Sequence, residues 1–523
     1  MSYSFKKVFL IIIDGFGLAP AGKNNPVSIA KMPFLNSLVK SYPVHNIVAS
    51  GLVVGLPWGK PGNSEVGHSA IGTGRVIVQD WVRINSSIED GSFFSNPAFM
   101  SAIENCRLKK SNLHIIGCAS PGGIHSHEDH LKSLLDLVAK ENVPAFVHMI
   151  TDGEDSGPTE SSATLSRMRK YLDEARAKIA TVIGRVYGMD RVLNWEVTQK
   201  TWRAIVDGIG EQIFDAGDFL ALNHKNGIDD DQITPAVILE SGKPVATVSD
   251  SDSVIFFNYR NDRAKQLLAP FVVSDFSGFA RTKIPKNLFV VTMTRYSNEL
   301  PVDAVAFEAV DIQHTLGREI SDRNLSQFRV AEKEKEAHVN NFFDGGRIEP
   351  YKGTEQVIVT SRQLRQFNYP KHPEMSAEQI VVELLARRKQ NFAFYLANFA
   401  NADMMAHTGK IDAAVAGLKV IDNCLKEIAE AVLDDPFSVL VITSDHGNSE
   451  ELVDPATGGP DTRHSTNNVI ALFAGKGLEQ ESDNSLESIV DRESSGSLID
   501  LAPTILKLLS FEKPVEMTGS SLL

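Results

Sequence analysis

The amino-acid sequence predicts an α/β protein, and three features carry that prediction. Short runs rich in β-branched and aromatic residues recur along the chain and are continuously apolar, as in strands buried on both faces of a parallel sheet. Amphipathic segments lie between these runs and predict helices that cover the sheets. The clearest case is the run 392–399, the amphipathic segment 412–433 and the run 437–444, which together predict a β-α-β unit.

The predicted strands are spaced far enough apart to leave room for helices. In chain order they are VFLIII at 8–13, LHIIGCA at 113–119, AFVHMIT at 145–151, SVIFFNY at 253–259, LFVVTM at 288–293, FAFYLANF at 392–399 and FSVLVITS at 437–444. A chain of 523 residues exceeds the usual size of one domain, so we expect two or three domains. No long linker rich in proline, glycine or serine marks a boundary between them.

Composition and charge narrow the classes of function. The formal net charge of −14 argues against a nucleic-acid partner, which would require a basic face. The three cysteines are Cys106, Cys118 and Cys424, and their wide spacing gives no disulfide framework, which suits a protein of a reducing compartment. We expect them to be core residues. The apolar run 8–13 is too short for the core of a signal peptide, and nothing approaches the ~18 apolar residues of a membrane-spanning helix. We therefore expect a cytoplasmic enzyme with no membrane partner.

A glycine-rich stretch, KPGNSEVGHSAIGTGR at 60–75, resembles a phosphate-binding loop. The spacing of Gly62 and Gly67 fits that motif, but the next residue is His68, where a phosphate-binding loop needs a lysine to reach the phosphates of a nucleotide. A nucleotide site is therefore not expected. The stretch instead predicts a flexible segment that leaves the hydroxyl of Ser64 accessible. If a helix begins near Ser64, its backbone amides could face an anion.

Carboxylates and imidazoles gather after the predicted strands. The residues are Asp14, Asp403, His407, Asp445, His446 and His464. Groups just past the carboxyl ends of parallel strands converge on one crevice. These side chains exceed what one tetrahedral ion needs, and a set of aspartates and histidines without cysteine suits Mn²⁺ or Zn²⁺ better than Ca²⁺. We therefore predict two neighbouring ions and a Ser64 hydroxyl that they activate as a nucleophile.

These residues also have structural explanations. A single aspartate at a strand end is usually a helix cap or turn residue, which would suffice for Asp14 alone, and a single histidine such as His464 is usually structural. The structural explanation is weaker for the whole set, because the patterns D-x-x-x-H, D-H-G-N and H-S-T-N would then all have to occur by chance. By its spacing, HSHEDH at 125–130 is an alternative metal site, and the charge run around Lys335 is typical of a solvated face.

The motifs GNSEVGHSAIGTGR, NFANADMMAHTG, TSDHGN and RHSTNN together resemble those of the cofactor-independent phosphoglycerate mutases of the alkaline phosphatase superfamily. Further similarity in GGIHSHEDHL, GRVYGMDR, NYRNDRAKQL, AEKEKEAHVNNFFDGG and HPEMSA extends the resemblance over nearly the whole chain. The resemblance implies an alkaline-phosphatase-like doubly wound α/β domain, residues 1–77 and 311–523, with a second α/β domain, residues 78–310, inserted into it. The first domain would bind metal, and the second would bind substrate.

The resemblance also implies roles for individual residues. Asp403, His407 and His464 would hold one Mn²⁺, and Asp14, Ser64, Asp445 and His446 the other. The substrate contacts carry over to His125, Asp155, Arg185, Arg191, Arg260, Arg263 and Lys335. The phosphoryl group of 3-phosphoglycerate would pass to Ser64 and return to the other hydroxyl, giving 2-phosphoglycerate, with Lys335 neutralising charge and Asp155 moving protons. The implied enzyme needs no 2,3-bisphosphoglycerate, and we expect a monomer whose partner is this small substrate.

One departure from the family pattern affects the expected substrate site. Where the family reads D-G-R-D, residues 152–155 read D-G-E-D, so Glu154 replaces an expected arginine. We expect Glu154 to turn away from the anionic substrate or to pair with Arg167 or Arg169. Two rival functions remain: a metal-dependent phosphotransferase or phosphatase acting on another phosphate ester, and a non-catalytic descendant that binds metal or a partner protein. The arginine and lysine set argues against the first, and the full ligand set with Ser64 argues against the second.

Overall fold

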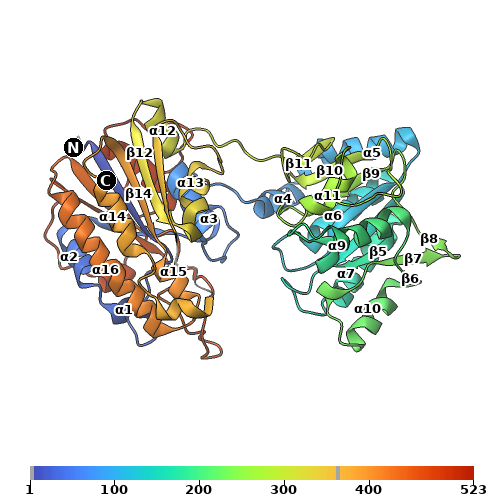
Figure 1. Ribbon diagram of the computed structural model, residues 1–523, viewed down its shortest axis with the longest axis horizontal. Coiled ribbons are helices and arrows are strands. Elements are labelled where there is room, and N and C mark those ends of the chain that lie inside the picture. Colours follow the sequence, from blue (N-terminus) through green and yellow to red (C-terminus); the bar gives the residue numbers. More distant parts are fainter. Residues whose placement is uncertain (1–4, 361–365) are drawn as a thin grey trace. The chain divides into compact units, whose positions relative to one another are not determined.

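The computed structural model describes residues 5–360 and 366–523. The chain forms two compact units, unit 1 from Met1–Gln79 with Asp311–Leu523 and unit 2 from Asp80–Val310 (Figure 1). Each unit contains a β-sheet covered by helices, which confirms the predicted α/β class. Among the described residues, no helix is both long and apolar enough to cross a membrane.

Unit 1 is built on a sheet whose eight described strands run in the order β13-β12-β14-β1-β15-β16-β2-β17. They are β1 (Lys7–Ile13), β2 (Val44–Val48), β12 (Ser326–Glu332), β13 (Thr354–Val359), β14 (Phe392–Phe399), β15 (Ser438–Thr443), β16 (Val469–Gly475) and β17 (Gly496–Ser497). The strands β12, β14, β1 and β15 are parallel to one another, so their carboxyl ends lie at one edge of the sheet. Residues that follow these strands therefore start from the same edge.

Hydrophobic cores lie on both faces of this sheet, because successive residues of a strand point to opposite faces. In β1, Phe9 and Ile11 pack with helices α2, α14 and α16, whereas Leu10 and Ile12 pack with α3, α12 and α18. Figure 1 shows α14 and α16 side by side. The helices of unit 1 are α1 (Pro26–Ala30), α2 (Pro33–Ser41), α3 (Ser64–Thr73), α12 (Leu316–Asp322), α13 (Glu336–Asn340), α14 (Ala377–Arg387), α15 (Asn401–Ala406), α16 (Ile411–Leu433), α17 (Leu486–Val490) and α18 (Leu501–Leu508).

Unit 2 has a sheet in the order β11-β10-β9-β3-β4-β5-β7-β6, with β8 paired to β7. Its strands are β3 (Leu113–Cys118), β4 (Ala145–Thr151), β5 (Lys178–Gly184), β6 (Glu211–Ile213), β7 (Ala236–Glu240), β8 (Lys243–Pro244), β9 (Ser253–Phe256), β10 (Phe289–Thr294) and β11 (Ala304–Phe307). Its helices are α4 (Asp80–Glu89), α5 (Pro97–Lys109), α6 (Glu128–Glu141), α7 (Ser161–Ala175), α8 (Arg185–Gly188), α9 (Trp195–Trp202), α10 (Ala216–Lys225) and α11 (Lys265–Val272). Ile115 packs with α5, α6 and α7, whereas its neighbour Ile116 packs with α9 and α11.

The strands predicted from apolar runs are confirmed, with small shifts at their ends. The strands at 145–151 and 392–399 have the expected bounds. The run 253–259 is a strand only as far as Phe256. Beyond that point the side chain of Asn258 accepts the hydrogen bond from the Cys118 amide, so the main chain no longer continues the ladder.

The predicted strands pair in parallel with one another, but each sheet also contains antiparallel strands that the apolar runs did not predict. β16 is antiparallel to β15 and to β2, and β7 is antiparallel to β5 and to β8. The loop 444–468, all of which the structure describes, contains no helix that could cross the sheet and enters β16 at the edge where β15 ends. β16 must therefore run in the opposite direction. As a result, His464 stays at the edge where β1, β14 and β15 end.

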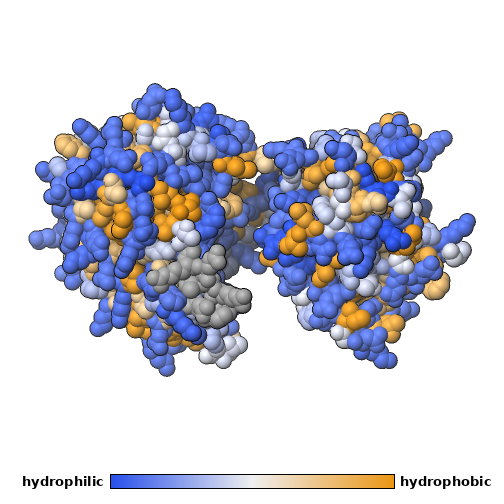
Figure 2. All heavy atoms as spheres, viewed as in Figure 1, coloured by the Kyte–Doolittle hydropathy of each residue, from blue (hydrophilic) through white to orange (hydrophobic). Residues whose placement is uncertain are grey.

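The visible surface is mainly polar, and the three cysteines lie in the apolar interior. Figure 2 shows hydrophilic residues over most of the visible surface of each unit, with hydrophobic residues in smaller groups between them. Cys106, Cys118 and Cys424 are buried free thiols, as expected. Burial raises the pKa of all three thiols, that of Cys424 to about 12, so they remain protonated and unreactive near neutral pH.

Helix α3 packs so closely against its neighbours that two of its positions require glycine. A Cβ atom at Gly72 would lie 1.9 Å from the carbonyl oxygen of Phe343, and one at Gly67 would lie 2.3 Å from that of Asp445. Backbone atoms cannot move aside as the end of a flexible side chain can. A larger residue would therefore shift the whole helix.

We predict that Gly72→Ala lowers the free energy of unfolding by about 1–3 kcal/mol, despite the higher helix propensity of alanine, because overpacking outweighs propensity in a tight core. Gly22→Ala is the control, since its Cβ would meet nothing within 4 Å. Urea titrations followed by circular dichroism measure the difference. A midpoint for Gly72→Ala at or above that of the control would contradict the close packing of α3.

Candidate active site

Buried charged side chains meet at the edge where the parallel strands of unit 1 end. Asp14 directly follows β1, Asp445 comes shortly after β15, and Asp403 lies in α15 after β14. Lys335 ends the 3₁₀ turn η5 (Lys333–Lys335), which follows β12. The three carboxylates are at most 3% exposed and Lys335 is 4% exposed. The order of the strands thus brings four distant segments of the chain to one buried cluster.

Lys335 is the cation at the centre of these carboxylates. Its Nζ lies 2.5 Å from Asp14 Oδ1 and 2.9 Å from Asp403 Oδ2. Burial by itself would lower the pKa of Lys335, but the aspartates outweigh it and hold that pKa above its usual value. Burial would likewise raise the pKa of Asp14 and Asp403, yet Lys335 and the nearby histidines hold both well below the usual range. The charge run is therefore not wholly a solvated face, because Lys333 is exposed while Lys335 points inward.

Ser64 presents its hydroxyl to the same cluster. It is the first residue of α3, which the side chain of Asn63 caps, and it is 7% exposed. Ser64 Oγ lies 2.8 Å from Lys335 Nζ and 3.0 Å from His446 Nε2, and it donates a hydrogen bond to Asp14 Oδ1 at 3.1 Å. A cation, an imidazole and a carboxylate thus surround one buried hydroxyl, as they do in activated nucleophiles.

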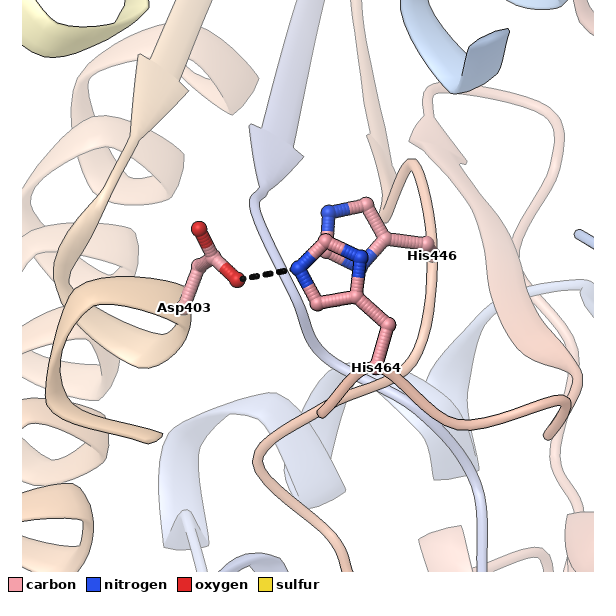
Figure 3. Close-up of side chains that lie close together, drawn as sticks. All are labelled: Asp403, His446 and His464. Carbon is pink, nitrogen blue, oxygen red and sulfur yellow. Dashed lines mark ion pairs between the residues drawn. The ribbon is translucent and has the colours of Figure 1, made fainter. Parts of the chain in front are cut away.

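Three histidines at this edge share one ring orientation. Each places Nδ1 near a main-chain oxygen: His407 at 2.9 Å from Thr462 O, His446 at 3.2 Å from Gly447 O and His464 at 2.9 Å from Gly62 O. In a neutral ring this contact assigns the proton to Nδ1 and leaves Nε2 free to bind an ion. His464 Nε2 lies 3.5 Å from Asp403 Oδ1, and Figure 3 shows the stacked rings of His446 and His464 beside that carboxylate.

Two overlapping groups of these side chains have the spacing of metal ligands. One is Asp403, His446 and His464, and the other is Asp14, Asp445 and His446; within each, the ligand atoms lie within 4.8 Å of one another. His407 adjoins the first group, with Nε2 3.2 Å from Asp403 Oδ1 and 3.1 Å from His464 Nε2. Asp445 Oδ2 is buried and accepts no hydrogen bond from the described residues, although His68 Nδ1 lies 3.1 Å from it. Nitrogen and carboxylate donors of this kind fit divalent ions such as Mn²⁺ and Zn²⁺.

Two asparagines that orient the carboxylates were not among the residues predicted from sequence. Asn398 Nδ2 donates to Asp14 Oδ2 at 2.8 Å, and Asn448 Nδ2 donates to Asp403 Oδ1 at 2.8 Å. Both are fully buried. A signal existed for each, because Asn398 is a polar residue inside an otherwise apolar strand and Asn448 closes the D-H-G-N motif.

Glu450 was also not predicted from sequence, and it connects the loops that carry the candidate metal ligands. Its buried carboxylate accepts hydrogen bonds from the Gly17 and Asn448 amides, each at 2.9 Å, and from Asn467 Nδ2 at 3.0 Å. Ser465 Oγ donates to the same carboxylate. These donors belong to the segments that contain Asp14, Asp445 with His446, and His464. No local pattern marked Glu450, since its partners come from distant parts of the chain.

A second polar cluster lies in unit 2 and is centred on Arg185. This side chain is 3% exposed, and its Nη1 lies 2.6 Å from Asp152 Oδ1 and 2.5 Å from Asp155 Oδ2. His125 Nε2 lies 3.7 Å from Asp155, and His125 Nδ1 lies 3.4 Å from Asp262. Burial and then Arg185 lower the pKa of His125 to about 4, against the opposing effect of the two aspartates. At neutral pH His125 is therefore uncharged.

Three more arginines predicted from sequence belong to this cluster. Arg191 Nη1 lies 2.9 Å from Asp262 Oδ2, and Arg260 Nε lies 3.2 Å from Asp262 Oδ1. Both side chains are about half exposed. Arg263 Nη2 lies 3.8 Å from Glu154 Oε2. The structure thus brings all six predicted substrate contacts of unit 2 into one network, while the seventh, Lys335, belongs to unit 1.

The expected partners of Glu154 were wrong. Glu154 Oε2 lies 3.0 Å from Arg185 Nη2, so it pairs with a cation, but with one of the arginines predicted to bind substrate. Arg167 binds Glu128 through two hydrogen bonds and Glu160 through another, so its guanidinium is already satisfied. The positive φ of Gly153, 79°, marks the turn just before Glu154.

The alternative metal site in HSHEDH is not supported. His127 packs edge-on against Trp81, with ring centroids 4.5 Å apart, and His130 Nε2 lies 2.9 Å from Asn85 Oδ1. Burial lowers the pKa of His130 to about 3. Among the described residues, the groups with metal-ligand spacing all lie in unit 1.

Comparison with known proteins reveals the family. A family described as BPG-independent PGAM N-terminus matches residues 84–298, within unit 2. A 2,3-bisphosphoglycerate-independent phosphoglycerate mutase of Acetivibrio thermocellus is 41% identical over 99% of both chains, and one of Clostridium kluyveri is 42% identical over 99% of both. The chain belongs to the 2,3-bisphosphoglycerate-independent phosphoglycerate mutases. A structure of the Leishmania mexicana phosphoglycerate mutase at low cobalt concentration matches with a TM-score of 0.70, at 26% identity over 99% of this chain and 97% of that one.

Membership of this mutase family confirms the resemblance that the sequence motifs indicated. The family segment covers the whole arginine cluster of unit 2, from His125 to Arg263. The similarity to the two bacterial mutases extends over nearly the whole chain and so includes Ser64 and the buried carboxylates of unit 1. Both polar clusters therefore lie in regions shared with the family.

If His446 is a metal ligand, it links metal binding to pH in this mutase. Burial would lower the pKa of His446, but Asp445, Asp14 and Asp403 raise it from 6.5 to about 10 in the metal-free protein. A raised pKa means that the proton stabilises the metal-free fold fully below about pH 6.5 and that this stabilisation is lost as the pH rises through about 10. An ion that binds His446 must displace this proton.

We predict that the metal-free mutase binds Mn²⁺, used as a probe, about tenfold more tightly for each pH unit between about pH 7 and about pH 9, because one proton is released. Calorimetry in buffers of different ionisation enthalpy measures that proton. In His446→Gln the release should disappear. A wild-type affinity that stays constant over this range would rule out His446 as a ligand.

Proposed function

We propose that the protein interconverts 3-phosphoglycerate and 2-phosphoglycerate with Ser64 as the transient phosphoryl carrier. The observation that carries the proposal is the Ser64 hydroxyl, which lies within 3.1 Å of Lys335, His446 and Asp14 in a buried, carboxylate-rich cluster. The substrate is taken from the bacterial relatives that bear the mutase name. Their name also indicates that no 2,3-bisphosphoglycerate is needed, which agrees with a carrier supplied by the protein itself.

The proposal includes two divalent ions, and Mn²⁺ is the ion that we favour. Asp403, His407 and His464 would hold one, and Asp14, Ser64, Asp445 and His446 the other. The donor set of carboxylates and Nε2 atoms supports two ions, although His446 rather than His407 completes the ligand spacing around Asp403 and His464. When bound, such ions lower the pKa of a coordinated hydroxyl and offset charge on phosphoryl oxygens.

The side chains of unit 1 would act on the phosphoryl group. The deprotonated Ser64 Oγ attacks phosphorus, the new Oγ–P bond forms as the bond from phosphorus to O3 breaks, and glycerate leaves with a proton on O3. In the second half of the reaction O2 of glycerate loses its proton and attacks the phosphoserine, which restores Ser64. Lys335, 2.8 Å from Ser64 Oγ, stabilises the negative charge in both halves.

The side chains of unit 2 would hold and protonate the substrate. Phosphoglycerate carries a carboxylate and a phosphate, and the forked guanidinium of arginine binds either with paired hydrogen bonds. Asp155, held by Arg185, would exchange protons with the two hydroxyls. His125 is neutral near pH 7, because its pKa is about 4, and can offer those hydroxyls either a donor or an acceptor.

We predict conversion of 3-phosphoglycerate to 2-phosphoglycerate without added 2,3-bisphosphoglycerate, loss of that activity on chelation and its return with Mn²⁺, because the buried carboxylates need bound cations to act on phosphate. A coupled enolase assay follows the product. Addition of 2,3-bisphosphoglycerate is the control and should change nothing. Full turnover by protein shown by elemental analysis to hold no metal would refute the proposal, and release of inorganic phosphate instead of 2-phosphoglycerate would favour the rival phosphatase.

We predict that Ser64→Ala lowers kcat by about 10⁴-fold or more, since a covalent carrier has no substitute at that position. Mn²⁺ binding should weaken only modestly, and the melting temperature should stay near that of the wild type. Ser69→Ala is the matched control, because Ser69 lies on the same helix and is also 7% exposed. Mass spectrometry of acid-quenched wild type should find phosphate on Ser64. Phosphate found reproducibly on another residue would exclude this carrier.

A further inference from the structure

The polar cluster of unit 2 has no excess of positive charge, although its proposed ligand is an anion. Its arginines are Arg185, Arg191, Arg260 and Arg263, and its carboxylates are Asp152, Glu154, Asp155 and Asp262. His125 adds no charge near neutral pH, because its pKa is about 4. The formal charges therefore cancel. An anionic substrate would gain from the departure of one of these carboxylates.

The four carboxylates differ in how firmly they are held. Asp152 is 4% exposed and accepts hydrogen bonds from Ser120 Oγ at 2.5 Å and from Arg185 Nη1 at 2.6 Å. Asp155 and Asp262 are 22% and 28% exposed, and each also faces His125. Glu154 is 45% exposed, and it contributes only ion pairs to this cluster. Glu154 is thus the carboxylate that can leave with the least loss of contacts.

The groups that Glu154 would release are donors directed at an anion. The carboxylate oxygen Oε2 lies 3.0 Å from Arg185 Nη2 and 3.8 Å from Arg263 Nη2. Arg185 Nε, on the same guanidinium, is buried and has no hydrogen-bond partner among the described residues. An oxyanion larger than a carboxylate offers more acceptor atoms to such donors.

We propose that Glu154 is a displaceable counter-ion, whose carboxylate occupies the place on Arg185 and Arg263 that an anionic group of the substrate takes. The inference rests on the proposed function, because it treats these two arginines as substrate ligands. On binding, a phosphate ester that carries a carboxylate replaces the Glu154 carboxylate, which turns to solvent. The Glu154 carboxylate competes equally with every such anion, so it lowers the affinity for each of them by the same factor and leaves their order of preference unchanged.

The test compares Glu154→Gln with the wild type, since glutamine keeps the size of the side chain and removes its charge. We expect KM for 3-phosphoglycerate to fall about two- to fivefold, the range for a partly exposed ion pair, with the change in KM rather than kcat. The Kd for inorganic phosphate, measured by calorimetry on the metal-loaded protein, should fall by a similar factor. Glu154→Ala should act in the same direction. Glu174→Gln is the matched control, because the Glu174 carboxylate pairs with Lys170 on α7 and the charge change is identical.

The outcomes separate this inference from the proposed function. If the wild type turns over 3-phosphoglycerate but both Glu154 variants leave KM and phosphate affinity unchanged or weaker, the counter-ion role is overturned and the proposed function stands. If the wild type shows no turnover, the proposed function fails. In that case, tighter phosphate binding by the Glu154 variants, with no change in Glu174→Gln, would still support the displacement of Glu154. Equal phosphate binding by the wild type and all variants would overturn that displacement.

Discussion

Three carboxylates buried together at one edge of a sheet are the constraint on which the candidate active site depends. Asp14, Asp403 and Asp445 are almost wholly removed from solvent. Burying unpaired charges costs several kcal/mol each, which is a large part of a domain's net stability of ~5–15 kcal/mol. Lys335 supplies one positive charge, and His446, with its raised pKa, supplies another. The same demand for positive charge suits the cluster to divalent cations, which under the proposed function would help the Ser64 hydroxyl to lose its proton.

The topology of unit 1 is what makes this concentration of charge possible. β12, β14, β1 and β15 are adjacent and parallel, so each delivers its following residues to the same edge. The antiparallel return into β16 keeps the loop with His464 at that edge. Glu450 then ties three of the ligand-bearing segments together through one buried carboxylate. The rigid sheet sets the positions, and the hydrogen bonds between loops set the orientations.

The polar cluster of unit 2 has balanced charges, whereas that of unit 1 has an excess of carboxylates. Its arginines are already matched by carboxylates, so the cluster is balanced before any ligand arrives. Partial burial costs less free energy for a cluster with balanced charges than for one with an excess of one sign. An anionic ligand must therefore replace one of the carboxylates, because no arginine is left unpaired for it. The most exposed carboxylate, that of Glu154, is where such an exchange costs least. Under the proposed function, unit 1 would bind cations and unit 2 would bind the anionic substrate.

Local sequence patterns were enough to predict the α/β class, most of the long strands, helix α16 and the residue types of both clusters. These depend on local periodicity and on short motifs, such as Asp403 and His407 one helical turn apart. Three features became visible only in the folded chain. Lys335 is buried although its neighbours in the chain are charged, Glu154 pairs with Arg185 rather than Arg167, and Glu450 connects the loops with the candidate metal ligands. Each of these depends on which distant side chains share a low-dielectric space, and no pattern of neighbouring residues records that. The direction of β16 depends likewise on the path of a long loop, which apolar runs alone do not specify.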